Sequence, residues 1–91
     1  PPQYYEVVLD ISVIGKDKQN FLYVVNTTWA GLFDIKGHTD KERHKAIAVT
    51  CPSMLFPYAQ QFIHDITFKA GYAPAFVQPI DFEDLYENRE T

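Results

Sequence analysis

Two segments near the start of the chain alternate between apolar and other residues, and this pattern constrains the fold more than any other feature. Such alternation, with a period of two, is typical of a half-buried β-strand. Aromatic and β-branched residues from Phe21 to about Trp29 predict a second strand, and the polar stretch 15–20 predicts a turn before it. We therefore expect an antiparallel hairpin. The apolar face of its first strand carries Tyr5, Val7, Leu9, Ile11 and Val13.

A third, shorter strand is predicted after the hairpin. Ala30 and Gly31 interrupt the alternation, and residues 32–35 have the pattern of a short strand that ends at Gly37. Three strands make a thin sheet, and an exposed strand edge invites pairing with another strand. We therefore expect a further N-terminal strand or a second subunit to cover that edge.

Helical patterns follow the strands. Residues 39–42 fit a capping box and predict the start of a helix. Pro52 predicts that this helix ends or kinks near Thr50 and Cys51, because proline lacks the amide hydrogen. A second helix should then bury a stripe with helical spacing. The stripe consists of Leu55, Tyr58, Ala59, Phe62, Ile63 and Ile66.

The remainder of the chain is predicted to be a connector and a short last helix. Gly71 favours the end of the second helix, and Pro74 prevents its continuation. Residues 72–80 are hydrophobic and rich in proline, which predicts an extended connector. Asp81 should cap a helix of about nine residues, and a helix that short is marginal alone. We expect it to dock on the rest of the chain.

Strands followed by helices are typical of the α+β class. The chain has 91 residues and a mass of 10.5 kDa, so we interpret residues 1–91 as a single small domain. Its one cysteine, Cys51, excludes an internal disulfide, and a chain this small gains stability from a partner chain. Since the only methionine is Met54, we expect a piece of a longer protein that is incomplete at its N-terminus.

The charge distribution and the hydropathy of the chain limit the kinds of partner that it can bind. Residues 1–80 hold seven basic and seven acidic side chains, whereas residues 81–91 hold five acidic side chains against Arg89 alone. The excess negative charge therefore lies on the C-terminal tail, and it disfavours nucleic acid or an anionic membrane as the main partner. No apolar run approaches the roughly 20 residues that a membrane helix needs, and no signal peptide is expected. The acidic tail could dock a basic partner or simply keep the protein in solution.

Other kinds of site find weaker support. His44 and Cys51 are seven residues apart and would share a face of an unbroken helix, as a Cys–His nucleophile requires. Neither an oxyanion loop nor an orienting residue accompanies them, so we expect no catalytic residue. His38 and Asp40 could join His44 as metal ligands, but such offsets recur by chance. The basic stretch 36–45 lacks interleaved aromatic residues for stacking on nucleic acid bases, and no cofactor motif is present.

A specific resemblance begins at residues 51–59, CPSMLFPYA, where two prolines flank Leu-Phe and Tyr-Ala follows. This run resembles the helix-entry motif of the SecB family of protein-export chaperones. Residues 5–9, 30–35 and 79–86 resemble, in turn, the family's second strand, its Gly-Ile/Leu-Phe turn and the run into its last helix. The resemblance covers essentially the whole chain. The family's N-terminal region, including its first strand, has no counterpart in residues 1–91.

The resemblance implies a fold and a role. SecB-type proteins are cytoplasmic homotetramers, dimers of dimers with helices between two antiparallel sheets. They act without ATP as holdases that keep precursor proteins unfolded, and they deliver them to the SecA translocation motor. Clients lie in apolar, aromatic-lined grooves. The resemblance thus implies protein translocation, unfolded clients and SecA as partners, with no enzyme activity, cofactor, nucleic acid or membrane insertion.

Carried over residue by residue, the resemblance implies two kinds of site. Tyr23 matches a groove aromatic, and Tyr86 falls where the family places a groove phenylalanine on its last helix. Phe82 and Leu85 share the face of Tyr86, so the four residues form the expected client-binding groove. Val24 and Asn26 match the family's SecA-facing leucine and glutamate, although Asn26 lacks the negative charge.

Two alternatives stay open from the sequence. Tyr23, Phe82 and Tyr86 could be ordinary core residues, as we expect for Phe33, Phe56, Phe62 and Phe68, which suit a core or a subunit interface. Trp29, Tyr72 and Phe76 could also contribute aromatic surface. The chain could, moreover, be a SecB-fold chaperone dedicated to one partner, such as the antitoxin of a toxin–antitoxin pair.

Overall fold

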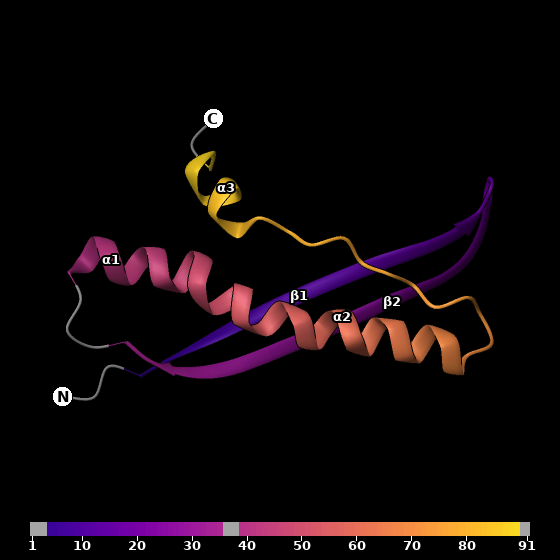
Figure 1. Ribbon diagram of the computed structural model, residues 1–91, viewed down its shortest axis with the longest axis horizontal. Helices are drawn as coiled ribbons and strands as arrows, with labels where there is room; N and C mark the ends of the chain where they lie inside the picture. Colours follow the sequence, from indigo (N-terminus) through magenta and orange to yellow (C-terminus); the bar gives the residue numbers. More distant parts are fainter. Residues whose placement is uncertain (1–3, 36–38, 90–91) are drawn as a thin grey trace.

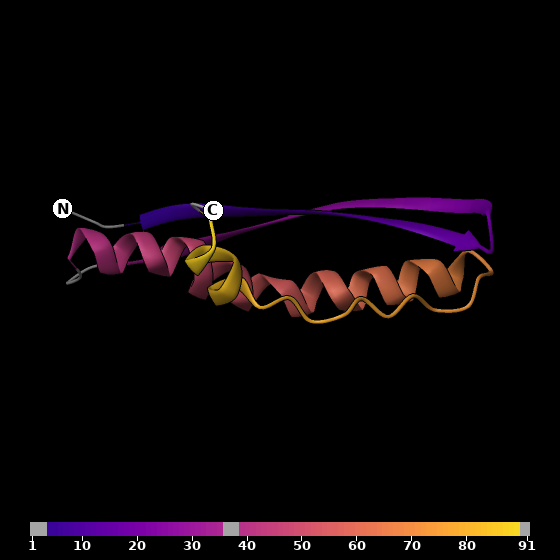
Figure 2. The ribbon, with the colours of Figure 1, turned by 90° about the horizontal axis from the view of Figure 1, so that it is seen from above.

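A computed structural model describes residues 4–35 and 39–89. A long hairpin is followed by helices that all lie on one of its faces, which confirms the α+β class (Figures 1 and 2). The elements are the strands β1 (Tyr4–Asp17) and β2 (Asn20–Asp34), the helix α1 (Asp40–Lys45), a π-helical segment (Ala46–Thr50), and the helices α2 (Cys51–Lys69) and α3 (Phe82–Glu87). We call residues 73–80, which join α2 to α3, the connector.

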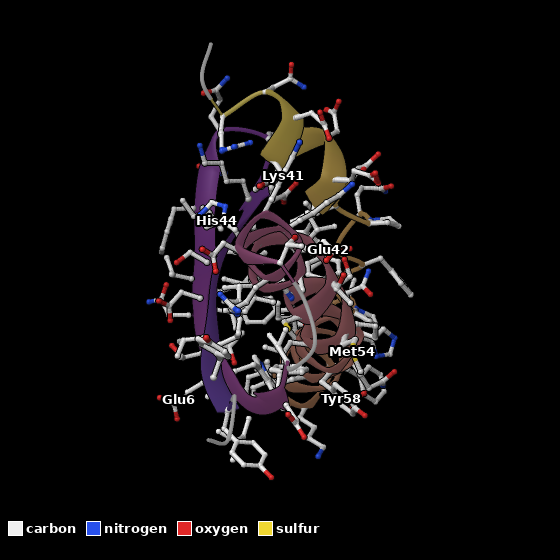
Figure 3. All side chains as sticks on the ribbon, turned by 90° about the vertical axis from the view of Figure 1, so that its left-hand side faces the viewer. Glu6, Lys41, Glu42, His44, Met54 and Tyr58 are labelled. Carbon is white, nitrogen blue, oxygen red and sulfur yellow. The ribbon has the colours of Figure 1, made fainter. Side chains whose placement is uncertain are left out.

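The hairpin confirms the predicted alternation. The two strands pair antiparallel from Tyr4 opposite Asp34 to Asp17 opposite Asn20, with a bulge after Gly15. Side chains from the expected apolar face of β1 are at least partly buried, whereas the intervening residues are exposed. Glu6, on the exposed face, lies on the opposite side of the molecule from Met54 of α2 (Figure 3).

The prediction of a separate third strand is wrong. Residues 32–34 belong to β2, which continues through Ala30 and Gly31 opposite Val8 and Val7. Gly31 does not break the strand, because its missing side chain makes room there. A Cβ atom at that position would lie 2.8 Å from the ring of Phe33. Residue 37, the predicted strand end, lies outside the described residues. Within the described ranges the sheet therefore has two strands and two open edges.

The first helix starts where it was predicted to start. Thr39 accepts a hydrogen bond from the amide of Glu42, and the Glu42 carboxylate accepts one from the amide of Thr39. This reciprocal pair is a complete capping box.

Pro52 was predicted to end or kink this helix near Thr50 and Cys51, and the helix does not end there, since the chain stays helical from α1 into α2 (Figure 1). The disturbance takes the form of the π-helical segment just before the proline. There the amide of Cys51 bonds to the carbonyl of Ala46, five residues back. Ser53 Oγ donates to the carbonyl of Val49 at 2.6 Å and satisfies a backbone acceptor beside the proline.

The core lies between the hairpin and one side of α2. Val7, Ile35, Cys51 and Leu55 form a buried cluster, which Trp29 and Phe33 flank. Further along α2, the fully buried positions are Ala59 and Ile63, followed by Thr67. The predicted stripe is therefore only partly correct. Tyr58, Phe62 and Ile66 are exposed because they lie towards or beyond one margin of the buried face.

The end of α2 and the docking of α3 follow the prediction. Gly71 has a φ of +97°, a left-handed conformation that glycine adopts at little cost, and it follows the last turn. The connector has neither helix nor strand and runs back beside α2 (Figure 1). Asp81 accepts a hydrogen bond from the amide of Asp84 and caps α3. The helix is six residues long, shorter than predicted.

Candidate functional site

Tyr23 lies near the hairpin turn, on the face of β2 that the helices cover. Its ring sits directly over Gly15, where a Cβ atom would overlap with it. The ring also tilts against Tyr72 with a centroid separation of 4.8 Å, and the Tyr72 hydroxyl donates to the carbonyl of Leu22 at 3.4 Å. An aromatic pair thus joins the hairpin to the residue that follows α2.

The three predicted site residues on α3 have unequal surroundings. Phe82 packs edge-on against the buried Phe56 at 5.8 Å between centroids. The Tyr86 hydroxyl lies 3.1 Å from Nδ1 of His44, and the guanidinium of Arg89 covers the Tyr86 ring at 3.9 Å. Leu85, in contrast, is 59% exposed. Phe82 and Tyr86 therefore anchor α3, and Leu85 is the residue of the three most open to solvent.

The four predicted groove residues do not meet within one chain. Tyr23 lies near the hairpin turn, whereas α3 packs against the π-helical segment, and the connector runs the length between them (Figures 1 and 2). They form two aromatic clusters joined by the connector. Their role in binding a client stays a prediction.

Val24 and Asn26 both lie on the helix-free face of the hairpin. Val24 is exposed and pairs across the strands with Ile14. Asn26 accepts a hydrogen bond from the hydroxyl of Ser12 directly opposite. One step further, Thr28 donates to Asp10 in the same way. The face thus carries polar cross-strand pairs at its centre and apolar residues nearer its ends.

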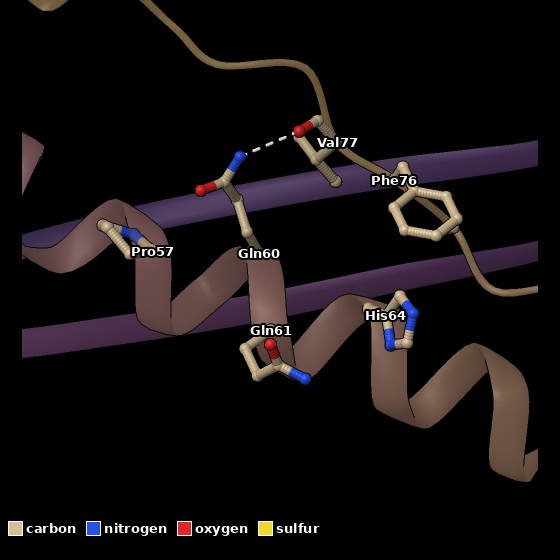
Figure 4. A pocket seen from close by; sticks show the side chains of 7 residues that line it. Pro57, Gln60, Gln61, His64, Phe76 and Val77 are labelled. Carbon is tan, nitrogen blue, oxygen red and sulfur yellow. Dashed lines mark hydrogen bonds between the residues drawn. The ribbon is translucent and has the colours of Figure 1, made fainter.

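A groove that the sequence did not reveal lies between α2 and the connector (Figure 4). Its volume is about 430 Å³, and we call it the connector groove. Pro57, Gln60, Gln61 and His64 line it from α2, and residues 75–77 line it from the connector. Phe76 is 78% exposed, and its ring meets that of His64 edge-on at 4.9 Å.

Two polar side chains of α2 hold the connector in place. Gln60 Nε2 donates to the carbonyl of Val77 at 2.9 Å (Figure 4), and Thr67 Oγ1 accepts from the amide of Ala75, also at 2.9 Å. Among the described residues, Thr67 is the one polar residue that is buried. Its hydroxyl also donates to the carbonyl of Ile63 in the preceding turn. These two residues were not singled out in the sequence analysis. Gln60 and Thr67 are seven residues apart and so lie on one side of a helix, and this spacing is the one sequence signal that could have pointed to their shared role.

A second groove, of about 440 Å³, lies between α2 and β2. We call it the Trp29 groove, because Trp29 forms its wall with Tyr58 and Phe62, at centroid separations of 6.3 and 6.0 Å. The indole N–H of Trp29 is buried and finds no hydrogen-bond acceptor among the described residues. Pro57 and Gln61 line both grooves, so the outward side of α2 separates them.

Charges near the two grooves are few. His64 Nδ1 lies 3.2 Å from Asp65 Oδ1, and this hydrogen bond lowers the pKa of the Asp65 carboxyl. Gln61 Nε2 donates to the same oxygen at 2.9 Å. The groove surfaces are otherwise mostly apolar, which suits hydrophobic side chains better than a charged small molecule.

The arrangement does not favour a cysteine nucleophile. The Cys51 side chain is 3% exposed, and burial raises the pKa of its thiol, whereas an activated cysteine needs a lowered pKa. His44 faces Tyr86 instead. Among the described residues, no three histidine, cysteine or carboxylate side chains gather as a metal site, and His38 lies outside these residues. Within residues 4–35 and 39–89, no helix combines the length and apolarity needed to cross a bilayer.

Comparisons with known proteins agree with the resemblance. The family model described as preprotein translocase subunit SecB matches residues 1–91. The protein-export protein SecB of Dechloromonas aromatica is 38% identical over 85 residues, which are 93% of this chain and 56% of that protein. Its counterpart in Marinomonas sp. is 40% identical over 82 residues, 90% of this chain and 52% of that protein.

A third relative, the protein-export protein SecB of Alkalilimnicola ehrlichii, is 34% identical over 86 residues, 94% of this chain and 46% of its own length. The chain spans about half the length of the curated relatives it matches. The family match, in contrast, extends over all 91 residues. On this ground, the chain belongs to the SecB family of preprotein translocase subunits.

Proposed function

We propose that this chain acts as an ATP-independent holdase in protein export, which keeps precursor proteins unfolded and delivers them to SecA. The observation that carries the proposal is the family match over residues 1–91. The two apolar grooves along α2 support it, because a holdase needs apolar surface that accepts many sequences. Residues 1–91 act as one SecB-like domain, with no catalytic residue and no cofactor.

Clients contact the two aromatic clusters, and the connector joins these contacts into one extended surface. Tyr23 contributes at the hairpin end, whereas Phe82, Leu85 and Tyr86 contribute at α3. Aromatic side chains suit this task, since they bury a large area with little loss of side-chain entropy. The exposure of Leu85 supports a direct contact there. Phe82 and Tyr86 contribute through the edges that their packing leaves accessible.

SecA meets the helix-free face of the hairpin at Val24 and Asn26. The exposure of both side chains supports this proposal. Asn26 carries no charge, and its side-chain oxygen already accepts a hydrogen bond from Ser12. The contact at these two positions therefore depends on shape and apolar area rather than on an ion pair.

The chain assembles as a homotetramer, a dimer of dimers, in the cytoplasm. Both edges of the two-stranded sheet are open, and open edges favour pairing with another strand. The Trp29 groove supports a further interface, because the exposed aromatic side chains of Tyr58 and Phe62 line it. Neither nucleic acid nor membrane insertion is part of this function.

A chaperone dedicated to one antitoxin is the less favoured candidate. The reported relatives are named for protein export, at 34–40% identity over at least 90% of this chain. Promiscuity separates the two candidates. A general holdase protects several unrelated unfolded proteins, whereas a dedicated chaperone protects one.

The experiment that tests the proposal is the solution mass by light scattering, alone and with a permanently unfolded protein. Four chains of 10.5 kDa give about 42 kDa, and we expect this mass to rise by one client. A monomer of 10.5 kDa that ignores every unfolded protein contradicts the proposal.

The variant Tyr86→Ala tests the client surface within the same experiment. It should weaken client capture and leave the tetramer intact. Tyr4→Ala is the matched control, because Tyr4 is an exposed tyrosine at the other end of the sequence, on the helix-free face. Equal client affinity in the two variants would remove Tyr86 from the client surface.

A further inference from the structure

The turn end of the hairpin carries an apolar surface on its helix-free face. Ile14 and Val24 lie opposite each other there, and both are exposed. Lys16 and Phe21 form the next pair towards the turn on the same face, because side chains two residues apart on a strand point to one side. Leu22, next to Phe21, is also exposed. We call the four apolar residues the tip patch: Ile14, Phe21, Leu22 and Val24.

The β-bulge after Gly15 gathers these side chains. The strand ladder pairs Lys16 with Phe21 and passes over Leu22, which is the extra residue. In a regular ladder Phe21 would share the helix-covered face with Tyr23, two residues further on. The bulge instead brings Phe21 to the exposed face and leaves Leu22 exposed as well. The irregularity therefore concentrates apolar surface at the turn.

The tip patch is bounded on one side and held in place by the rest of the chain. Ser12 and Asn26, the next pair away from the turn, are polar and hydrogen bonded to each other. The Tyr72 hydroxyl donates to the carbonyl of Leu22 and so attaches the bulge to the residue that follows α2. The turn lies at one end of the molecule, remote from α1 and α3 (Figures 1 and 2). The patch is thus a fixed surface at an extremity.

The charge beside the tip patch differs in sign from that of the chain as a whole. Lys16 and Lys18 flank the patch, with Asp17 between them, whereas the chain has a net charge of −4. The acidic first turn of α3 lies towards the opposite end of the molecule (Figure 1). A negatively charged surface would attract the turn end and repel the end that carries α3. The two ends thus favour one orientation at such a surface.

We propose that the tip patch is a peripheral contact with an anionic lipid bilayer, in which Lys16 and Lys18 meet the headgroups and the apolar side chains pack at the interface. Apolar side chains beside lysines suit such an interface. A second copy of the chain fits less well, because a symmetric contact would bring the same lysines together. An unfolded polypeptide requires apolar surface but no cation.

This contact goes beyond the proposed function and does not depend on it. The net negative charge of the chain makes a bilayer a secondary partner, met at one end of the molecule only. The contact stays at the headgroups and inserts no segment across the bilayer. It gives the chain a way to collect at a membrane surface without a spanning helix.

Vesicle flotation of the full chain tests the contact directly. One set of vesicles contains phosphatidylcholine alone, and the other contains about a third of phosphatidylglycerol, which is anionic. We expect about tenfold stronger binding to the anionic set at about 0.1 M salt. The double variant Lys16→Gln with Lys18→Gln should weaken this binding about tenfold or more, because each lysine near an anionic surface contributes about fivefold.

A second double variant controls for overall charge. Lys41→Gln with Lys45→Gln removes the same charge from α1, far from the turn. It should change the affinity by less than about twofold, since salt screens charges beyond about 10 Å. Equal losses in the two double variants would overturn the tip contact. Equal binding to both sets of vesicles, or binding to neither, would also overturn it.

Two leucines of β2 test the apolar part of the contact. Leu22 and Leu32 are both exposed, but Leu32 lies near the other end of the hairpin, opposite Glu6. We expect Leu22→Gln to weaken binding to anionic vesicles about threefold to tenfold and Leu32→Gln to leave it unchanged. Equal effects of the two substitutions contradict the proposal. Circular dichroism establishes that each variant is folded before its affinity is measured.

The other occupants of the tip patch give different results for Leu22→Gln. A lower solution mass with unchanged vesicle binding would assign the patch to a second copy of the chain. Weaker capture of an unfolded protein with unchanged vesicle binding would assign it to clients. Either result overturns the bilayer contact. Because flotation uses neither a client nor SecA, its failure leaves the proposed holdase function standing.

Discussion

The two sides of α2 are held to the rest of the chain by different kinds of contact. Towards the hairpin, α2 presents Leu55, Ala59 and Ile63, which are buried and apolar. Towards the connector, it presents Gln60 and Thr67, each with one hydrogen bond to a backbone without regular structure. Burial of an apolar side chain contributes more free energy than a single hydrogen bond. The hairpin side of α2 therefore supplies more of the stability than the connector side.

The strongest test of this comparison uses two isoleucines of one helix. Ile63 is 0% exposed and Ile66 is 40% exposed. We expect Ile63→Ala to lower the free energy of unfolding by about 2–5 kcal/mol, because it leaves a cavity in the core. Ile66→Ala should cost clearly less, since its site is open to solvent. Urea denaturation of both variants measures the difference, and equal losses would break the comparison.

The next largest effect on stability is expected at the start of α1, which contributes to neither of the two compared sides of α2. Thr39→Ala removes one half of the capping box and should lower the free energy of unfolding by about 1 kcal/mol. Thr50→Ala is the control, because Thr50 makes no capping hydrogen bond. A loss as large as that of Ile63→Ala would show that α1 and the core unfold together.

A smaller effect is expected at the hairpin turn. Lys18 has a φ of 59°, in the left-handed region that most side chains avoid and asparagine tolerates. Lys18→Asn should therefore raise the free energy of unfolding by about 0.5 kcal/mol. Lys16→Asn, two residues earlier in β1, should give no such gain. A gain at both positions would point to charge rather than backbone conformation.

The smallest effect is the pH dependence of stability that the titration of the Cys51 thiol adds. Burial raises its pKa in the folded chain, so the folded state holds the proton more tightly than the unfolded state. Its stabilising contribution is complete below the unfolded thiol pKa and is lost as the pH rises above it. We expect wild type to lose stability relative to Cys51→Ala as the pH rises above about 8.5. The difference between their denaturation curves measures this, and a constant difference contradicts it.

Much of the fold could be predicted because the patterns involved are local. The alternation from Tyr5 to Val13 and the capping box at Thr39 depend on neighbouring residues alone. Gly31 misled the prediction, because a glycine that breaks a strand and one that makes room for the ring of Phe33 look the same in sequence. Tyr58 and Ile66 were predicted to be buried but are exposed, for a related reason. A helical stripe does not show which of its margins the sheet will cover.

The candidate site was less accessible from sequence than the fold. Tyr23 and Tyr86 were singled out through a family resemblance, but nothing in the chain indicated that they lie in separate clusters. Gln60 and Thr67 were missed because their partners, Ala75 and Val77, belong to a segment without periodicity. Contacts between a helix and an irregular segment leave no repeating signal. Phe76, in contrast, was already named among the aromatic candidates.

The π-helical segment has a consequence for how the two ends of the long helix are oriented. It carries one residue more than a regular helix would need, because its hydrogen bond reaches five residues back instead of four. The wider turn accommodates that residue within the segment, so the winding of the helix on either side is kept in phase. Deleting one residue from Ala46–Thr50 would restore regular winding and leave His44 and Lys45 directed towards Tyr86 and Glu83. The segment thus absorbs an extra residue while the half of the helix that receives α3 and the half that packs on the hairpin keep their relative orientation.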